Sequence, residues 1–120
     1  MAKKEVKELK NYEMMVVLKP LLPDDVRKEV QKNFVDLLKK LGGEVVDIDV
    51  WGKRYLAYNI KGHNEGYYIV YNFKAPSSSI SECKRKMSLV QEILRYMIVE
   101  KKHPEEIGSK IKKKEMNLDV

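Results

Sequence analysis

The residues best suited to binding chemistry lie together in the segment DVWGKRYLAYNI, residues 49–60. This segment holds the only tryptophan of the chain, Trp51, followed by Gly52 and the adjacent cations Lys53 and Arg54. Cationic side chains neutralise phosphate groups, and aromatic rings stack on unpaired bases. We therefore predict that this block binds RNA or a partner protein, although a cross-strand ladder with cation–π contacts would use the same residue types.

The sequence around this block predicts one long strand over residues 44–60. Its apolar residues share one parity and are expected to face a hydrophobic core: Val46, Ile48, Val50, Leu56, Tyr58 and Ile60. Because side chains alternate across a strand, the opposite face would then carry Trp51, Lys53, Tyr55 and Ala57. Strict alternation would turn Arg54 toward the core, where a guanidinium requires a partner. We therefore expect a bulge at Gly52 that turns Arg54 outward, or a position for Arg54 beyond the helical layer.

Other cations are further candidates for binding an anionic partner. The run KRK, residues 84–86, is the densest basic cluster within the predicted fold, and a solvated helix face is its alternative interpretation. Arg95 lies in a β-rich run, where it could instead pair with a carboxylate. The net charge of +6 and the pI near 9.3 favour nucleic acid, acidic protein or a membrane surface as partner. A lysine-rich surface that serves solubility or thermostability would give the same charge balance.

The remaining reactive residue types do not form a catalytic or metal-binding pattern. Cys83 is the only cysteine and lies on an apolar stripe without a nearby base, so we expect a small core residue. His63 falls in a turn and His103 in the tail, and we expect no metal and no cofactor. A single cysteine fits a reducing compartment, and no apolar segment follows the charged N-terminus, so the expected location is the cytoplasm.

Length and hydrophobic content indicate one domain with one modest core. The chain has 120 residues, of which 43% are hydrophobic, and no apolar run approaches the roughly 18–20 residues of a membrane span. We expect a flexible N-terminal arm over residues 1–10, a folded domain over residues 11–102 and a basic tail over residues 103–120.

The hydrophobic pattern predicts six elements in the order βαββαβ. Strands are expected over residues 11–20, 44–60, 67–74 and 93–100, helices over residues 24–41 and 79–87, and a turn over residues 61–66. Asp24 is expected to cap the first helix and the pair Gly42-Gly43 to end it. Ser79 with Glu82 indicates a capping box at the second helix.

This order predicts an α+β fold of the ferredoxin-like class. Two amphipathic helices must cover one face of a four-stranded antiparallel sheet to bury both apolar stripes. Right-handed crossovers place the first and third strands at the centre, and the second face of the sheet is left open. Many functions occur on this fold, so the fold alone does not assign one.

The block WGKRYLAYNI resembles the signature WG(K/R)R-x-LAYPI of the ribosomal protein S-six family of the bacterial small subunit. Three other segments agree in order, because YEMMVVLKP, EGYYIVYNFKAP and VQEILRYMIVEKK are similar to the first, third and last strands of that family. The resemblance covers residues 11–102. Asn59 is a departure, since the family usually has proline there, and it restores an N–H donor that proline lacks.

The resemblance implies a non-enzymatic protein of the small ribosomal subunit. Members of the family bind the central domain of 16S rRNA cooperatively with ribosomal protein S-eighteen, with which they form a heterodimer. Such contacts would read mainly phosphate and RNA shape. Carried onto this sequence, the candidates for RNA or partner binding are Trp51, Lys53, Arg54, Lys84, Arg85, Lys86, Arg95, Lys101 and Lys102.

Three other functions use the same fold. An RNA-recognition motif would need a leading cation and two further aromatics in the window EGYYIVYN, residues 65–72, which lacks them. An acylphosphatase-like enzyme would need an arginine and an anion cradle after the first strand, where the sequence reads KPLLP, residues 19–23. A dimeric small-ligand domain would need a specific polar pocket, which the sequence does not reveal.

Overall fold

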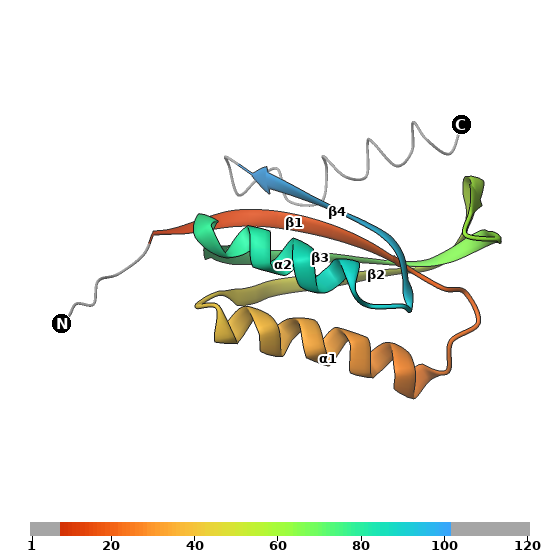
Figure 1. The fold of residues 1–120 in the computed structure, drawn as a ribbon, viewed down its shortest axis with the longest axis horizontal. Coiled ribbons are helices and arrows are strands. Elements are labelled where there is room, and N and C mark those ends of the chain that lie inside the picture. The colour runs from red at the N-terminus through yellow and green to blue at the C-terminus, as the bar shows by residue number, and fades with distance from the viewer. Residues whose placement is uncertain (1–7, 102–120) are drawn as a thin grey trace.

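The computed structural model of the chain describes residues 8–101, and these form a four-stranded antiparallel sheet with two helices (Figure 1). The sheet order is β2-β3-β1-β4, so the first and third strands are central, as predicted. The ferredoxin-like α+β fold is confirmed. The elements are β1 (Leu9–Leu18), α1 (Asp24–Lys40), β2 (Glu44–Ile60), β3 (His63–Pro76), a 3-10 turn (Ser77–Ser79), α2 (Ile80–Ser88) and β4 (Ile93–Lys101).

Element boundaries differ from the prediction mainly at the hairpin that joins β2 and β3. The turn consists of Lys61 and Gly62 alone, with φ values of 52° and 85°, where residues 61–66 were expected. Two consecutive residues with positive φ make a tight hairpin turn whose twist matches that of the strands. As a result β3 begins at His63, and β2 and β3 continue together beyond the remaining strands (Figure 1). β1 begins at Leu9, inside the predicted arm.

The helix starts differ from the predicted caps, whereas the end of α1 agrees. Pro23 holds the N-cap position of α1, so Asp24 is the first helical residue and ion-pairs with Arg27. Ser79 makes no capping bond to α2, because its Oγ donates to the carbonyl of Pro76 at 2.7 Å within the 3-10 turn. The N-cap predicted at Asp24 was therefore wrong, whereas Ser79 does hold the N-cap position of α2 but lacks the predicted capping bond. At the end of α1, Gly42 adopts a φ of 90°, which only glycine adopts without strain.

The helices cover one face of the sheet and form the main core there. Phe34 and Leu38 of α1 and Cys83 and Met87 of α2 are buried against strand residues such as Tyr71. The core residues of the two central strands alternate along each strand and point toward the helices. Besides Tyr71 they are Tyr12, Met14, Val16, Leu18, Ile69, Phe73 and Ala75.

The opposite face of the sheet carries a second apolar cluster rather than the open surface that was expected. Its members are each 4% exposed or less: Met15, Val17, Tyr68, Val70 and Leu94. The reason is visible in the central strands, where residues 14–18 of β1 and 67–71 of β3 are apolar or aromatic at every position. Side chains of such runs are apolar on both faces of a sheet.

Candidate nucleic-acid interface

A bulge at Gly52 organises the candidate site on β2. In the register with β3, Val50 faces Ile69 and Gly52 faces Tyr68, so β2 contains one extra residue at this point. Gly52 has a φ of 84°, and no heavy atom lies within 4 Å of where its Cβ would be. The predicted bulge is therefore confirmed. One inserted residue reverses which face each later side chain of the strand occupies.

The bulge brings Trp51 and Arg54 onto the same face, opposite the helices. The Trp51 ring stacks on Tyr68 with centroids 6.0 Å apart and planes 8° from parallel. The guanidinium carbon of the exposed Arg54 lies 4.9 Å from the Trp51 centroid. On the indole edge, Nε1 donates a 3.0 Å hydrogen bond to the Asp49 carboxylate. Tyrosine, indole and guanidinium thus form a layered stack anchored on the central strand β3.

The predicted row of Trp51, Lys53 and Tyr55 on one face was wrong, and the bulge is the cause. Lys53 is opposite Tyr67, which packs on the helix-side core. The Nζ of Lys53 lies 3.7 Å from a carboxylate oxygen of Glu65. Tyr55 is opposite Glu65 and shares that side. Lys53 and Trp51 therefore occupy different faces of the sheet.

The apolar parity predicted for β2 also fails at the bulge. Ile48 and Val50 do lie on the helix side, opposite Tyr71 and Ile69, but β2 is an edge strand and they stay 39% and 49% exposed. Leu56 and Ile60 were assigned to the same face, yet they pack against the second apolar cluster on the other side. The register also shifts between Val45 and Asp47, so strict alternation holds only from Asp47 to Val50.

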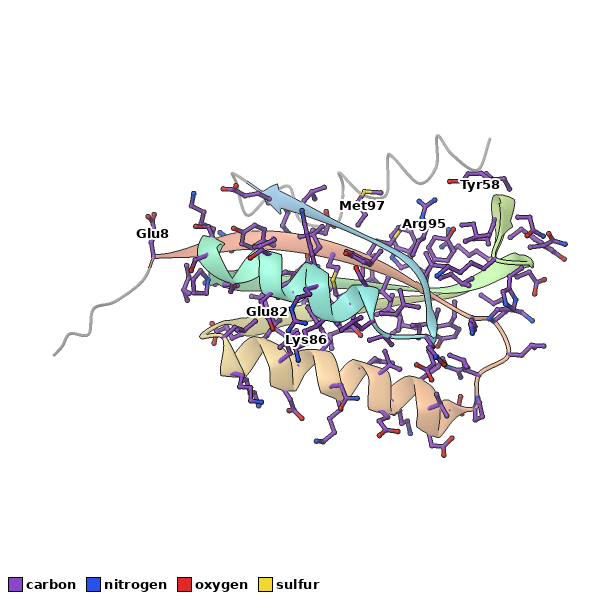
Figure 2. All side chains as sticks on the ribbon, viewed as in Figure 1. Glu8, Tyr58, Glu82, Lys86, Arg95 and Met97 are labelled. Carbon is purple, nitrogen blue, oxygen red and sulfur yellow. The ribbon has the colours of Figure 1, made fainter. Side chains whose placement is uncertain are left out.

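Arg95 of β4 contributes to the same face as Arg54. It is opposite Val17 of β1, a member of the second apolar cluster. Its Nη1 donates a 3.1 Å hydrogen bond to the hydroxyl of Tyr58, which lies near the end of the long hairpin (Figure 2). We define the Trp51 face as Trp51, Arg54, Tyr58 and Arg95. Sequence reasoning missed Tyr58 in this role, because no local pattern brings together residues 37 positions apart.

The basic cluster of α2 lies on the other side of the sheet. Lys84, Arg85 and Lys86 are exposed, as the helical pattern predicted. Arg85 is held by Glu82 through two bonds, from Nη2 at 2.8 Å and from Nε at 3.1 Å. The hydrogen bond from Arg85 lowers the pKa of Glu82, and the same contact raises the pKa of Arg85. Because Cys83 and Met87 of this helix pack on the helix-side core, the cluster and the Trp51 face do not form one continuous surface.

Lys101 is not a surface residue, contrary to the prediction. It is only 3% exposed, and its Nζ donates a 2.6 Å hydrogen bond to the Asn72 side chain. The buried residue Glu13 is opposite Asn72 in the register of β1 and β3. These three buried polar residues share the face of the sheet opposite the helices, where Lys101 has a structural role. Lys102 lies outside the described residues.

Within residues 8–101, no group of three or more His, Cys, Asp or Glu side chains is arranged to hold a metal ion. Neither of the two helices in that range is long and apolar enough to cross a membrane. Cys83 is buried, and burial raises the pKa of its thiol to about 11, with the nearby Glu82 carboxylate adding to the shift. A protonated, inaccessible thiol is a poor nucleophile.

Comparison with known proteins gives one consistent result. The family model described as Ribosomal protein S6 matches residues 11–100. Small ribosomal subunit protein bS6 of Dictyoglomus turgidum is 41% identical over 90 residues, which is 75% of this chain and 93% of that protein. The bS6 protein of Carboxydothermus hydrogenoformans is 37% identical over 91 residues, covering 76% of this chain and 95% of the relative.

A solved structure has the same fold. The crystal structure of 30S ribosomal protein S6 from Thermotoga maritima superimposes with a TM-score of 0.74 at 23% identity, over 94% of this chain and all of that one. The family model extends from the first strand through the Trp51 block to the last strand. This family is a structural family of the ribosome and not an enzyme family. The chain is therefore a protein of the small subunit of the cytoplasmic ribosome, and it belongs to the ribosomal protein S6 family.

Proposed function

We propose that this chain binds the central domain of 16S rRNA, cooperatively with ribosomal protein S-eighteen as a heterodimer, and that the Trp51 face is a principal contact. The observation that carries the proposal is the exposed Arg54 guanidinium stacked over Trp51, on the face where Arg95 also lies. A stacked guanidinium keeps its N–H donors directed outward in its plane, where they match the oxygens of a phosphate. Such contacts bind the RNA backbone without reading base sequence.

The α2 cluster is proposed as a second contact with RNA or with the partner protein. Lys84 and Lys86 carry the binding charge here, because Arg85 is already paired with Glu82. The cluster and the Trp51 face lie on opposite sides of the sheet, so a flat RNA surface cannot meet both. We infer one of two arrangements. Either one surface binds RNA and the other binds the partner protein, or the RNA bends around an edge of the sheet and contacts both surfaces.

Lys53 is proposed only as a minor contact. Its amine lies near the Glu65 carboxylate on the helix side and is therefore partly compensated. Arg54 and Lys53 are neighbours in sequence with the same charge but occupy different faces. They form a matched pair for mutation, because both are exposed and neither substitution removes a core residue.

The test is filter binding of the full chain to a central-domain 16S rRNA fragment, with and without the partner protein, over a salt series. We expect Arg54→Ala to weaken binding and to reduce the slope of log affinity against log salt by about 0.7–0.9 for each phosphate that the arginine neutralises. Lys53→Ala should change both quantities less. Cooperative binding predicts that the partner tightens RNA binding by roughly 5- to 150-fold.

Two outcomes would contradict this proposal. Absence of binding in every mixture would remove the RNA function itself. Equal binding by wild type and Arg54→Ala, with weaker binding by Lys84→Ala and Lys86→Ala, would move the RNA surface to α2. The partner protein would then be the candidate occupant of the Trp51 face.

A further inference from the structure

We infer that the tip of the β2–β3 hairpin is an additional RNA contact, in which Tyr58 stacks on an unpaired base. This inference rests on the proposed function and extends it by giving a base-stacking role to Tyr58, which strand alternation had assigned to the hydrophobic core. We define the hairpin arm as residues 55–65, because β1 pairs with β3 only from Tyr67 onward, so the arm has no third strand beside it. Figure 1 shows the arm leaving the sheet and turning toward the side of β4.

The arm presents two large aromatic side chains to solvent on its opposite faces. Tyr55 is 75% exposed and Tyr58 is 57% exposed, although burial of a tyrosine ring would be favourable. Tyr58 lies on the side of the Trp51 face, because its hydroxyl accepts the hydrogen bond from Arg95. Tyr55 lies on the helix side, opposite Glu65. Of this pair, only Tyr58 is therefore positioned on the Trp51 face, in contact with Arg95.

The contact with Arg95 orients the Tyr58 ring. The bond uses the hydroxyl at the ring edge, so it fixes the direction of the side chain and leaves the ring faces exposed. Figure 2 shows Tyr58 and Arg95 approaching each other from the hairpin and from β4. An exposed ring held beside a guanidinium group is an arrangement by which proteins bind single-stranded RNA, with stacking on the base and charge on the phosphate.

Asn59 holds the tip of the arm in place. Its Oδ1 accepts a 2.8 Å hydrogen bond from the Gly62 amide, and its Nδ2 donates a 2.9 Å bond to the Asn64 side chain across the hairpin. Proline, the residue usual at this position in the related signature, has no side-chain group that could make either bond. Asn59 directly follows Tyr58, so the two bonds limit the motion of the residue that presents the ring.

The charge of the arm and its base favours an anionic occupant. Between residues 53 and 66 there are three cations, Lys53, Arg54 and Lys61, and one carboxylate, Glu65. Arg95 adds a further cation from β4. An acidic protein segment would also be attracted by this charge, but an exposed tyrosine ring adds nothing specific to a carboxylate, whereas it adds a stacking surface for a base.

The experiment compares wild type with three variants of the full chain in binding to the central-domain rRNA fragment, with the partner protein present. Tyr58→Leu keeps an apolar side chain and removes the aromatic face, and Tyr58→Phe keeps the face and removes the hydroxyl. Tyr55→Leu is the matched control, since it removes an exposed tyrosine from the other side of the same arm. Circular dichroism verifies that each variant is folded.

We expect Tyr58→Leu to weaken RNA binding by roughly 5- to 150-fold, the range for removal of one base stack. Tyr58→Phe should weaken binding much less, and Tyr55→Leu should bind like wild type. Dimethyl sulfate probing should show an unpaired adenine or cytosine that is protected by wild type and by Tyr58→Phe but not by Tyr58→Leu. A further variant, Asn59→Pro, should weaken binding a few-fold and speed amide exchange at Gly62.

The failures of this inference and of the proposed function are distinguishable. If Tyr58→Leu binds like wild type while Arg54→Ala is weakened, the arm is not an RNA contact and the proposed function stands. If Tyr55→Leu and Tyr58→Leu weaken binding equally, the effect is not a directed base stack and the inference is overturned. If wild type binds no RNA in any mixture, both are overturned.

Discussion

Arg54 lies over the ring of Trp51, three residues earlier in the same strand, with 4.9 Å between the guanidinium carbon and the ring centroid. In a regular strand, residues three apart point to opposite faces. Here they share a face because Gly52 inserts one residue between them. The proposed RNA contact therefore depends on the conformation of a glycine around whose Cα there is open space.

The first prediction concerns that glycine. Because Gly52 has a φ of 84°, we expect Gly52→Ala to lower the free energy of unfolding by about 1–2 kcal/mol through backbone strain. No heavy atom lies near the added Cβ, so steric clash should not contribute. Urea unfolding measures the change. Gly52→Asn should cost less, because asparagine tolerates positive φ better. A fully stable Gly52→Ala would mean that the bulge is not maintained by glycine.

A second glycine is predicted to be essential for a different reason. A Cβ on Gly66 would lie 2.3 Å from Cγ1 of Val17, so Gly66→Ala must displace the second apolar cluster. We expect a decrease of about 1–3 kcal/mol in unfolding free energy, the usual cost of overpacking. The double variant Val17→Ala with Gly66→Ala should be destabilised by less than the sum of the two single variants, since the smaller side chain makes room. Additive effects would contradict this close approach.

Lys101 is predicted to stabilise the fold and not to bind RNA directly. Its buried ammonium donates to Asn72 at 2.6 Å, and removal of a hydrogen bond from a charged group costs about 1.5–3 kcal/mol. We expect Lys101→Ala to reduce the unfolding free energy by that amount. Lys86→Ala, at an exposed position of α2, should change it by no more than about 0.5 kcal/mol. If Lys101→Ala and Lys86→Ala had equally small effects in urea unfolding, Lys101 would not be buried and this prediction would be wrong.

The Cys83 thiol gives a prediction about pH. Burial raises its pKa from 9.0 to about 11 in the folded chain. Above pH 9 the unfolded chain therefore releases this proton while the folded chain keeps it, and the unfolding free energy falls as pH rises from 9 to 11. Burial also raises the pKa of Tyr71, which extends the decline to higher pH. The measurement is urea unfolding of wild type and Cys83→Ala over this range; Cys83→Ala should show a shallower decline.

Labelling of Cys83 provides an independent check on the same burial. Reaction of the thiol with a disulfide reagent at about pH 8 should proceed only through opening of the fold, because the buried thiol is neutral and inaccessible. The rate should rise with urea in parallel with unfolding. Rapid labelling of the native chain would show that α2 exposes Cys83 more readily than its packing indicates.

Sequence alone was sufficient for the element order and for the central position of β1 and β3, and it gave a bulge at Gly52 as one of two alternatives. Periodicity located the helices, and the glycine beside a tryptophan and two cations indicated the break in β2. The orientations after the bulge were not predictable by simple alternation, because one inserted residue moves Lys53, Arg54 and Leu56 to the other face. Choosing between a bulge and a regular strand requires the register with β3.

The remaining differences arise from contacts distant in sequence. The local sequence groups Lys101 with a basic run, whereas the fold places it beside Asn72, 29 residues earlier in the chain. Tyr58 joins the Trp51 face only through Arg95. Neither pairing leaves a local pattern, whereas the Gly42 helix end and the Cys83 stripe are local and were predicted.

The strand order also has a consequence for how the chain folds as it is made. β1 pairs with β3 and β4 but not with β2, so the first 60 residues contain two strands that share no native backbone ladder. During synthesis, β1 has no native strand to pair with until β3, which begins at His63, has been made. Because β4 ends at Lys101, the sheet is completed only when most of the chain has emerged, and one side of the apolar β1 stays open to chaperones until then.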